Sequence, residues 1–588
     1  MKEFFKYVFA TIVGIILLSI IMGILGVMSL VGIVASGEQT KNIQDNSVLV
    51  VKLSGTMSER AENDIMAEFT GQMGSQIGLD NLLSAIKKAK ANESVKGIYI
   101  EAGAFAPDSY ASLQAARNAL LDFKKSGKWI VAYGDSYTQG AYYLSSVADK
   151  LWVNPEGMID WHGLASEKFF VKDLLEKAGV KMQVAKVGSY KSAVETFIGD
   201  KMSDADREQT LAYITSIWNN VTKDVAASRK VSVEQLNAYA DSLVTLASPS
   251  SYVKMRLADG LLYTDQVKQE VKKMLKLDAD KSINQLSISD MATAKGDTKG
   301  DEIAVYYAFG EIVSGVTGEF SREHQIESEK VCYDLEKLMN DDDVKAVVLR
   351  VNSPGGSAYA SEQINHYIKM LQAKKPVVVS MGGMAASGGY YISAPANWIV
   401  AEPTTLTGSI GIFGMFPDFS NLLTQKLGIK FDEVKTNKNS AFGSMGRPFN
   451  AEEMRLLESY IDRGYNTFRQ RVAEGRKLSV DSVEKIAQGH VWTGEDALKI
   501  KLVDQLGGLD VALAKAAKLA KLEEYHAKSY PAPADWLDNF LKMTKKGSYL
   551  DEGLQAFMGE YYEPFMFIKT IRQKDPVQAR IPYYINIK

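Results

Sequence analysis

Cysteine is nearly absent from this sequence, in which Cys332 is the single thiol among 588 residues. One cysteine excludes an intrachain disulfide, and it excludes a cluster of thiolates able to hold zinc or iron. P-loop, dinucleotide-binding and zinc-binding motifs are also missing, so the sequence implies no cofactor and no metal. We interpret Cys332 as a small buried apolar residue.

A bias toward one sign of charge is missing as well. The 68 Lys and Arg residues nearly balance the 71 Asp and Glu residues, which leaves a formal net charge of -3. Nucleic acid is therefore not an expected partner. A chain of 588 residues is longer than one hydrophobic core supports, so the sequence predicts at least two domains.

Charged side chains are absent from one long stretch near the N-terminus. Tyr7–Ala35 comprises 29 residues without Asp, Glu, Lys or Arg, whereas a helix that spans a bilayer needs about 20 apolar residues. We predict one transmembrane helix. Lys2 and Lys6 precede it and Glu38 follows it, so the bulk of the chain is expected on the periplasmic side of the cytoplasmic (inner) membrane. The alternative is a signal peptide cleaved near residues 34–36.

The rest of the chain contains an internal repeat with a period of about 248 residues. Val95–Ile98 matches Val344–Val347, and Tyr110–Ser112 matches Tyr359–Ser361, with 249 positions between the paired segments. Two further pairs extend the match, Gly140–Tyr143 with Gly388–Tyr391 and Arg229–Val233 with Arg476–Val480. Self-similarity at a fixed period indicates duplicated structural units.

Each half alternates short β-rich runs with longer amphipathic stretches, a pattern typical of an α/β fold built from βα units. In the second half, strands are expected over Ile303–Phe309, Ala346–Val351 and Val377–Ser380, and a helix over Ser361–Ala373. The expected organisation is an N-terminal transmembrane anchor (1–36), a first domain (46–265), a helix and exposed linker (266–300), a second domain (301–524) and a C-terminal tail (525–588).

Two glycine-rich motifs in the second half are candidates for a catalytic site. Asn352–Gly356 reads Asn-Ser-Pro-Gly-Gly and follows a predicted strand, and Ala385–Gly389 reads Ala-Ala-Ser-Gly-Gly. Paired glycines let backbone N–H groups approach a ligand closely. In this order and spacing the motifs resemble the Clp-protease and crotonase superfamily. The resemblance implies that Ser387 is the nucleophile and that the N–H groups of Gly356 and Gly388 stabilise the oxyanion.

A serine nucleophile needs a base, which is histidine in many hydrolases. None of the five histidines stands in a recognisable relation to Ser387; they are His162, His324, His366, His490 and His526. A lysine kept neutral by burial is the other known solution, because desolvation lowers its pKa from about 10.4 toward 7 or 8.

The candidate lysine lies in the first half, in the sequence Gly188-Ser-Tyr-Lys191-Ser-Ala. This motif, combined with Ala-Ala-Ser-Gly-Gly in the second half, resembles the long, two-domain form of the signal peptide peptidase A (protease IV) family, from the membrane anchor to about residue 520. The resemblance implies that Lys191 is the general base for Ser387. It also implies that Ser409, in Thr-Gly-Ser-Ile-Gly, orients the lysine.

The repeat allows an internal check, because each half can be examined at the other half's catalytic positions. Gln139 stands opposite Ser387, so the first half has no nucleophile. Pro107 stands opposite Gly356 and has no N–H to offer an oxyanion. Residues 439–440 stand opposite Lys191, and Lys438, one or two residues out of register, is the alternative base.

The resemblance implies a membrane-bound serine endopeptidase that degrades released signal peptides and similar apolar peptides through an acyl-enzyme. It further implies a homo-oligomer, a tetramer in relatives of this type, that encloses the sites. Two alternatives remain open at this stage. One is a catalytically inactive membrane scaffold of the same fold, and the other is a crotonase-type enzyme acting on acyl thioesters.

Overall fold

The computed structural model describes residues 43–60, 76–296, 299–315, 324–532 and 577–581, together with six positions among the first 21 residues. The predicted transmembrane helix over Tyr7–Ala35 lies mostly outside the described residues. Within them, no helix is both long and apolar enough to cross a membrane.

The first half is built on a parallel sheet whose strand order is β2-β1-β3-β4-β5-β7, with β8 paired to β1. Its strands are β1 (Ser47–Ser58), β2 (Gln76–Gly78), β3 (Val95–Ala106), β4 (Trp129–Tyr137), β5 (Lys150–Ile159), β7 (Gly260–Leu261) and β8 (Asn284–Leu286). Apolar side chains fill both faces, as expected for a parallel sheet covered by helices.

The second half repeats this plan in a sheet of order β18-β16-β14-β12-β9-β20, with β15 paired to β14 and β19. Its strands are β9 (Asp301–Phe309), β12 (Val344–Ser353), β14 (Val377–Ala386), β15 (Trp398–Ala401), β16 (Leu406–Gly408), β18 (Val491–Thr493), β19 (Gln505–Leu506) and β20 (Tyr525–Tyr530). In register, Val347 pairs with Val377 and Leu349 with Val379, all buried. The strands expected from sequence are therefore confirmed, each somewhat longer than predicted.

Equivalent helices of the two halves have equal lengths, which supports the duplication. The pairs α3 and α13 have 13 residues each, α4 and α14 have 15, and α8 and α16 have 26. Their bounds are α3 (Leu79–Ala91), α4 (Tyr110–Lys124), α8 (Asp204–Arg229), α13 (Ser328–Asn340), α14 (Ala358–Gln372) and α16 (Ala451–Arg476). The predicted helix over Ser361–Ala373 is α14.

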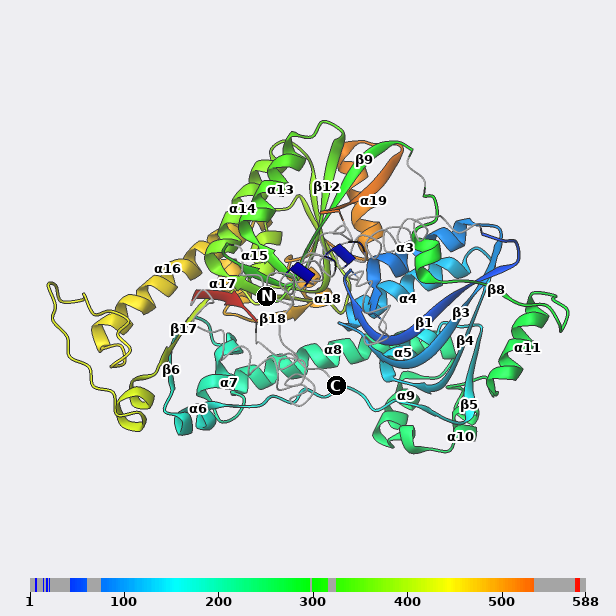
Figure 1. The fold of residues 1–588 in the computed structure, drawn as a ribbon, viewed down its shortest axis with the longest axis horizontal. Helices are drawn as coiled ribbons and strands as arrows, with labels where there is room; N and C mark the ends of the chain where they lie inside the picture. Colours follow the sequence, from blue (N-terminus) through cyan, green and yellow to red (C-terminus); the bar gives the residue numbers. More distant parts are fainter. Residues whose placement is uncertain are drawn as a thin grey trace.

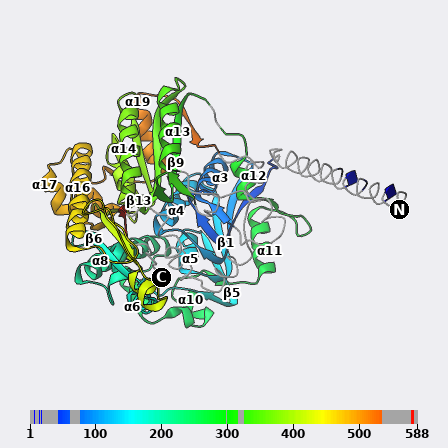
Figure 2. The same cartoon turned by 60° about the vertical axis from the view of Figure 1, so that its left-hand side comes forward.

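The remaining helices cover the sheets and the ends of the molecule. They are α5 (Gln139–Ser145), α6 (Lys172–Ala178), α7 (Glu195–Ile198), α9 (Val233–Asp241), α10 (Pro249–Lys254), α11 (Thr264–Met274), α12 (Ile288–Ala292), α15 (Gly388–Ser393), α17 (Val480–Ile486), α18 (Gly494–Lys499) and α19 (Leu509–Ala520). Figure 2 shows α13, α14 and α19 of the second half at one end and β5 and α10 of the first half at the other.

A third sheet joins the halves and contains strands from three distant parts of the chain, in the order β11-β10-β13-β21-β17-β6. These strands are β6 (Lys181–Lys186), β10 (Glu311–Val313), β11 (Gln325–Glu327), β13 (Gly355–Ser357), β17 (Phe413–Asp418) and β21 (Val577–Arg580). The first-half strand β6 pairs antiparallel with β17 over six residue pairs. In Figure 1, β6 and β17 lie side by side between α16 and α7.

The expected boundaries need two corrections. The segment predicted as a helix and an exposed linker (266–300) contains the helix, as α11, but its second part is not uniformly exposed, because β8 joins the first sheet and α12 packs on α3 with Met291 fully buried. Three apolar side chains, Leu286, Ile288 and Met291, contact the first core and explain this packing. The predicted tail over 525–588 likewise begins with β20, which pairs with β9 and belongs to the second sheet.

A buried ion pair fixes the two halves against each other. Arg350 on β12 bonds to Glu59 at the end of β1 through Nε–Oε1 at 2.6 Å and Nη2–Oε2 at 3.2 Å. Its other N–H groups donate to Ser380 Oγ and the Met381 carbonyl, each at 3.0 Å. The planar guanidinium satisfies both carboxylate oxygens at once, so this contact sets the relative position of the two sheets.

Candidate active site

Ser387 lies in the sharp turn between β14 and α15, at the carboxyl end of a central strand. Its backbone has φ 54° and ψ -112°, a conformation that costs a non-glycine residue about 1–3 kcal/mol. Its N–H donates to the Gly408 carbonyl at 2.8 Å, where β14 pairs with β16. A strained strand-to-helix turn of this kind is typical of nucleophilic serines.

Lys191 comes from the first half, in the turn that follows β6. Pairing of β6 with β17 brings this turn to the second half, where the Val187 N–H donates to Ile412 and the Tyr190 N–H donates to Gln488. Gly188 has a φ of +100°, and a methyl group there would overlap the Gln488 backbone at 2.4 Å. The sequence at Gly188–Lys191 therefore suits a turn that must pass close to another chain segment.

Two further residues hold the lysine itself. A methyl group on Gly489 would lie 2.7 Å from the Lys191 Cα, so only glycine leaves room for the lysine backbone. Gln209 on α8 donates to the Tyr190 carbonyl at 3.0 Å and to Ser192 Oγ at 3.1 Å, and its Oε1 accepts from the Val491 N–H at 3.2 Å. The lysine turn is thus bound to both halves.

The amine of Lys191 meets three oxygen atoms. Nζ lies 2.8 Å from Ser387 Oγ and 3.1 Å from both the carbonyl oxygen and Oγ of Ser409. Lys191 is 1% exposed and Ser387 0% exposed. Burial without a neighbouring carboxylate lowers the pKa of Lys191 well below its ordinary value. A neutral amine has two N–H donors and one lone pair, which match two Ser409 acceptors and one Ser387 hydroxyl.

The expected oxyanion donors lie next to Ser387. Gly388 directly follows it in α15, and β13 carries Gly356 past the N-terminus of the same helix. A methyl group on Gly388 would lie 3.1 Å from the Gly355 Cα, so the two motifs are in close contact. Gly355 has a φ of +99°, which favours glycine.

The equivalent positions in the first half carry other residues than a serine and a glycine. Gln139, at the start of α5, donates to Tyr110 OH at 2.9 Å and accepts from the N–H groups of His162 and Gly163 at 3.0 Å. Pro107 packs on Gly140, where a methyl group would lie 3.3 Å from the proline ring. A glutamine amide and a proline ring therefore fill the positions that the second half gives to a hydroxyl and an N–H.

The other candidates from the sequence lie elsewhere. Lys438, the alternative base, is 75% exposed at its side chain and pairs with Glu452. All five histidines are described, and none hydrogen-bonds with Ser387. The His490 carbonyl accepts from the Ser409 N–H at 2.7 Å, and the His490 ring packs on Tyr190. Cys332 is buried in the second core, as expected, and burial raises the pKa of its thiol to about 11.

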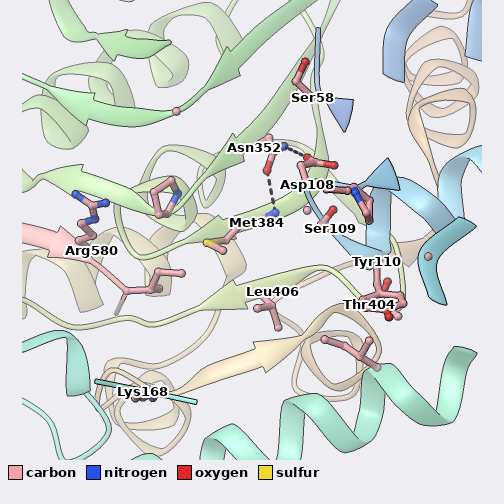
Figure 3. A pocket seen from close by; sticks show the side chains of 18 of the residues that line it. Ser58, Asp108, Ser109, Tyr110, Lys168, Asn352, Met384, Thr404, Leu406 and Arg580 are labelled. Carbon is pink, nitrogen blue, oxygen red and sulfur yellow. Dashed lines mark hydrogen bonds between the residues drawn. The ribbon is translucent and has the colours of Figure 1, made fainter. Parts of the chain in front are cut away.

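A cavity of about 1010 Å³ opens between the halves beside this site. Asn352 lines it, donating to Asp108 Oδ2 at 3.1 Å and accepting from the Met384 N–H at 3.0 Å (Figure 3). Leu406 lines the cavity from β16, and Ser192 lines it from the lysine turn. Pro354, which precedes Gly355 in the glycine motif, also lines the cavity, whereas Ser387 and Lys191 do not.

Comparison with protein families agrees with this geometry. The model of peptidase family S49 matches the chain twice, over residues 122–278 and 369–523. The chain belongs to peptidase family S49. A Clp protease model also matches residues 319–399, which include the Asn-Ser-Pro-Gly-Gly motif and Ser387. The fold is thus a tandem duplication of Clp-protease-like α/β units, as the sequence predicted.

Relatives of the S49 chain cover most of its length. Protease 4 of Salmonella typhi is 36% identical over 91% of this chain and 88% of its own length. The chloroplastic serine protease SPPA of Arabidopsis thaliana is 30% identical over 82% of this chain and 70% of its own length. A putative signal peptide peptidase SppA of Enterococcus faecium is 35% identical over 39% of this chain and 69% of its own length. The protein is a serine protease, and this decides against the inactive scaffold and the thioester enzyme.

Sequence reasoning missed the residues that hold the lysine in this S49 protease. Gly489 and Gln209 had no motif around them. Gly489 contacts Lys191 from about 300 positions away, and Gln209, although near the lysine turn in sequence, connects that turn to Val491 in the second half. The strand β21 was missed too, because the first half has no counterpart from which the repeat could reveal it.

Proposed function

We propose that this serine protease uses Ser387 as nucleophile and Lys191 as general base, with Ser409 orienting the lysine. The observation that supports this assignment most directly is the 2.8 Å contact between Lys191 Nζ and Ser387 Oγ in a buried location. The amine takes the hydroxyl proton as Ser387 attacks the peptide carbonyl. The N–H groups of Gly356 and Gly388 stabilise the oxyanion, and the amine then returns the proton to the leaving nitrogen.

Labelling with a serine-directed fluorophosphonate tests this assignment. The probe should modify Ser387 alone, identified by peptide mass mapping, and Lys191→Met should suppress the labelling while leaving the fold intact. Labelling of another serine would contradict the proposal. Lys438→Ala serves as the matched control, because that lysine is exposed, and its label should equal that of the unaltered protein.

The pH dependence follows from the lowered pKa of Lys191. Below that pKa the amine is protonated and cannot accept a proton, so kcat/KM should rise with pH through the lowered value and then level off. The pH profile of kcat/KM is measured from hydrolysis of a fluorogenic peptide between pH 5 and pH 10. A profile that follows an ordinary lysine, rising only near pH 10, would show that Lys191 is not the base in question.

We further propose that the substrates are released signal peptides and similar apolar peptides, and that an N-terminal helix anchors the enzyme in the cytoplasmic membrane with its catalytic domains on the periplasmic side. The relative named signal peptide peptidase supports the substrate class. The uncharged run Tyr7–Ala35 supports the anchor. Exposed apolar side chains at Leu427, Val434 and Phe442 support a homo-oligomer, for which we propose a tetramer.

Anchoring gives a direct fractionation prediction. The full chain should sediment with membranes, whereas a version that begins near Gln44 should stay in the supernatant. Protease added to intact spheroplasts should digest the main body of the full chain, with a cytoplasmic protein as the control for leakage. Digestion only after lysis would place the catalytic domains on the cytoplasmic side and contradict the orientation.

A further inference from the structure

The cavity between the halves has one wall from each copy of the repeat. The first-half wall consists of residues 105–110 together with Thr138, which precedes α5. It includes Pro107, which stands where the second half has its oxyanion glycine. The second-half wall includes Asn352 and Pro354 of the catalytic motif itself. The first half has therefore lost the catalytic residues, but the segment that carried them still faces the same cavity.

Asp108 presents a carboxylate to this cavity. The residue is exposed there, and its Oδ2 accepts from Asn352 Nδ2 at 3.1 Å (Figure 3). Ser112 on α4 hydrogen-bonds with the same carboxylate from the first half. Both donors are neutral, and among the residues that the structure describes no cation forms an ion pair with Asp108. The carboxylate is thus held in position while its charge stays unpaired.

The basic side chains that line the cavity already have acidic partners. Lys168 Nζ lies 2.7 Å from both carboxylate oxygens of Asp206, and Arg580 Nη1 lies 2.8 Å from Glu311 Oε1. Figure 3 shows Lys168 and Arg580 well away from Asp108. Among the described lining residues, five are Asp or Glu and two are Lys or Arg. This excess of negative charge favours a positively charged ligand.

The ionisation of Asp108 depends on its position between the halves. Solvent reaches it through the cavity, but protein surrounds it, so burial raises its pKa to about 6, with a smaller contribution from the Glu59 charge. Arg350, the cation that acts on Asp108 in the opposite sense, is bonded to both oxygens of Glu59. Asp108 is therefore mostly ionised at neutral pH and gains from a nearby cation.

The carboxylate is within reach of a peptide bound at Ser387. Asn352, which donates to Asp108, accepts from the Met384 N–H at 3.0 Å, and Met384 lies on β14 three residues before Ser387. A strand rises about 3.3 Å per residue, so about 10 Å of strand separate Met384 from Ser387. An extended peptide that reacts with Ser387 covers this distance with about three or four residues.

We propose that Asp108 is a specificity-determining residue that binds a positively charged group of the peptide substrate, a Lys or Arg side chain or the N-terminal amine. This inference rests on the proposed roles of Ser387 and Lys191, and it adds a charge preference to their apolar substrates. Phe309 and Leu406 line the cavity and cover the apolar stem of a basic side chain, while the carboxylate takes its charged end. The first half then selects the peptide that the second half cuts.

Paired fluorogenic peptides test the site. Each pair shares one apolar sequence with an acetylated N-terminus and differs by lysine or norleucine, scanned over the positions on either side of the cut bond. At one position the unaltered protein should show a kcat/KM on the order of 10-fold higher for lysine, mainly through a lower KM. Asp108→Asn should bring this ratio to about one, because the amide still accepts from Asn352 but has no charge.

Two controls locate the effect. Asp173→Asn removes an exposed charge on α6, outside the residues that line the cavity, and should keep the lysine preference. Norleucine peptides of different lengths with a free N-terminus show whether the terminal amine is bound in place of a side chain. The preference should also shrink below about pH 6 as Asp108 takes up a proton. The protonation of Lys191 affects both peptides of a pair equally and cancels in the ratio.

The outcomes separate this inference from the proposed function. If the unaltered protein cuts charged and uncharged peptides equally at every position, the site is refuted and the proposed function stands. A lysine preference that survives Asp108→Asn, or that is lost equally in Asp173→Asn, also refutes it. If the protein cuts none of the peptides, the proposed function itself fails.

Discussion

Ser387→Ala is expected to lower peptide hydrolysis by at least about 1,000-fold, because loss of a nucleophile usually costs most of an enzyme's acceleration. The change removes one oxygen atom, so folding and assembly should persist, and circular dichroism with light scattering checks this. Hydrolysis of a fluorogenic peptide gives the rate. Activity above about one part in a thousand, in a preparation free of host proteases, would mean that another residue attacks the substrate.

Ser393→Ala provides the matched control. Ser393 lies on the same helix, α15, and is also fully buried, but its hydroxyl donates to the Gly389 carbonyl at 2.7 Å rather than to the lysine. Its loss should cost a small amount of stability and leave most of the activity. Equal loss in both variants would indicate a general disturbance of the helix, not removal of the nucleophile.

Lys191→Ala and Lys191→Arg are both expected to lower activity by at least about 1,000-fold. Arginine keeps its proton at every working pH and cannot accept one from Ser387. Lys438→Ala should keep near-full activity, because that lysine is exposed and paired with Glu452. The reverse outcome, an active Lys191→Ala and an inactive Lys438→Ala, would overturn the assignment.

Lys191→Met should lose activity and gain stability. Burial holds the pKa of Lys191 well below its unfolded value, so between that lowered pKa and about 10.4 the unfolded chain binds more protons at this side chain than the folded chain does. Folding stability therefore rises with pH between the lowered pKa and about 10.4. Methionine removes this penalty and should raise the free energy of unfolding by about 0.5–2 kcal/mol at pH 7. Denaturant unfolding at pH 7 and pH 10 measures the difference, which should shrink at pH 10.

The sequence was sufficient to predict the duplicated fold and to propose the residues of the site. The repeat predicted two equivalent α/β units, since 249-residue spacing appears only if both halves keep the same strands and helices. The glycine motifs predicted Ser387, Gly356 and Gly388 through the family resemblance that they carry, and close backbone approaches explain why glycine is needed beside the serine. The incompleteness of each half, with Gln139 and Pro107 in the first, pointed to a site shared between halves.

The contacts that complete the site were decided by the tertiary structure. The antiparallel pairing of β6 with β17 brings Lys191 to Ser387, and Gly489 and Gln209 hold it there. The path of β21 between β13 and β17 had no signal in the repeat. Local sequence patterns indicate which backbone conformation each residue needs and which face of its helix or strand it occupies. They do not record which distant strand will complete an open sheet edge, because that depends on where the finished fold brings the two edges together.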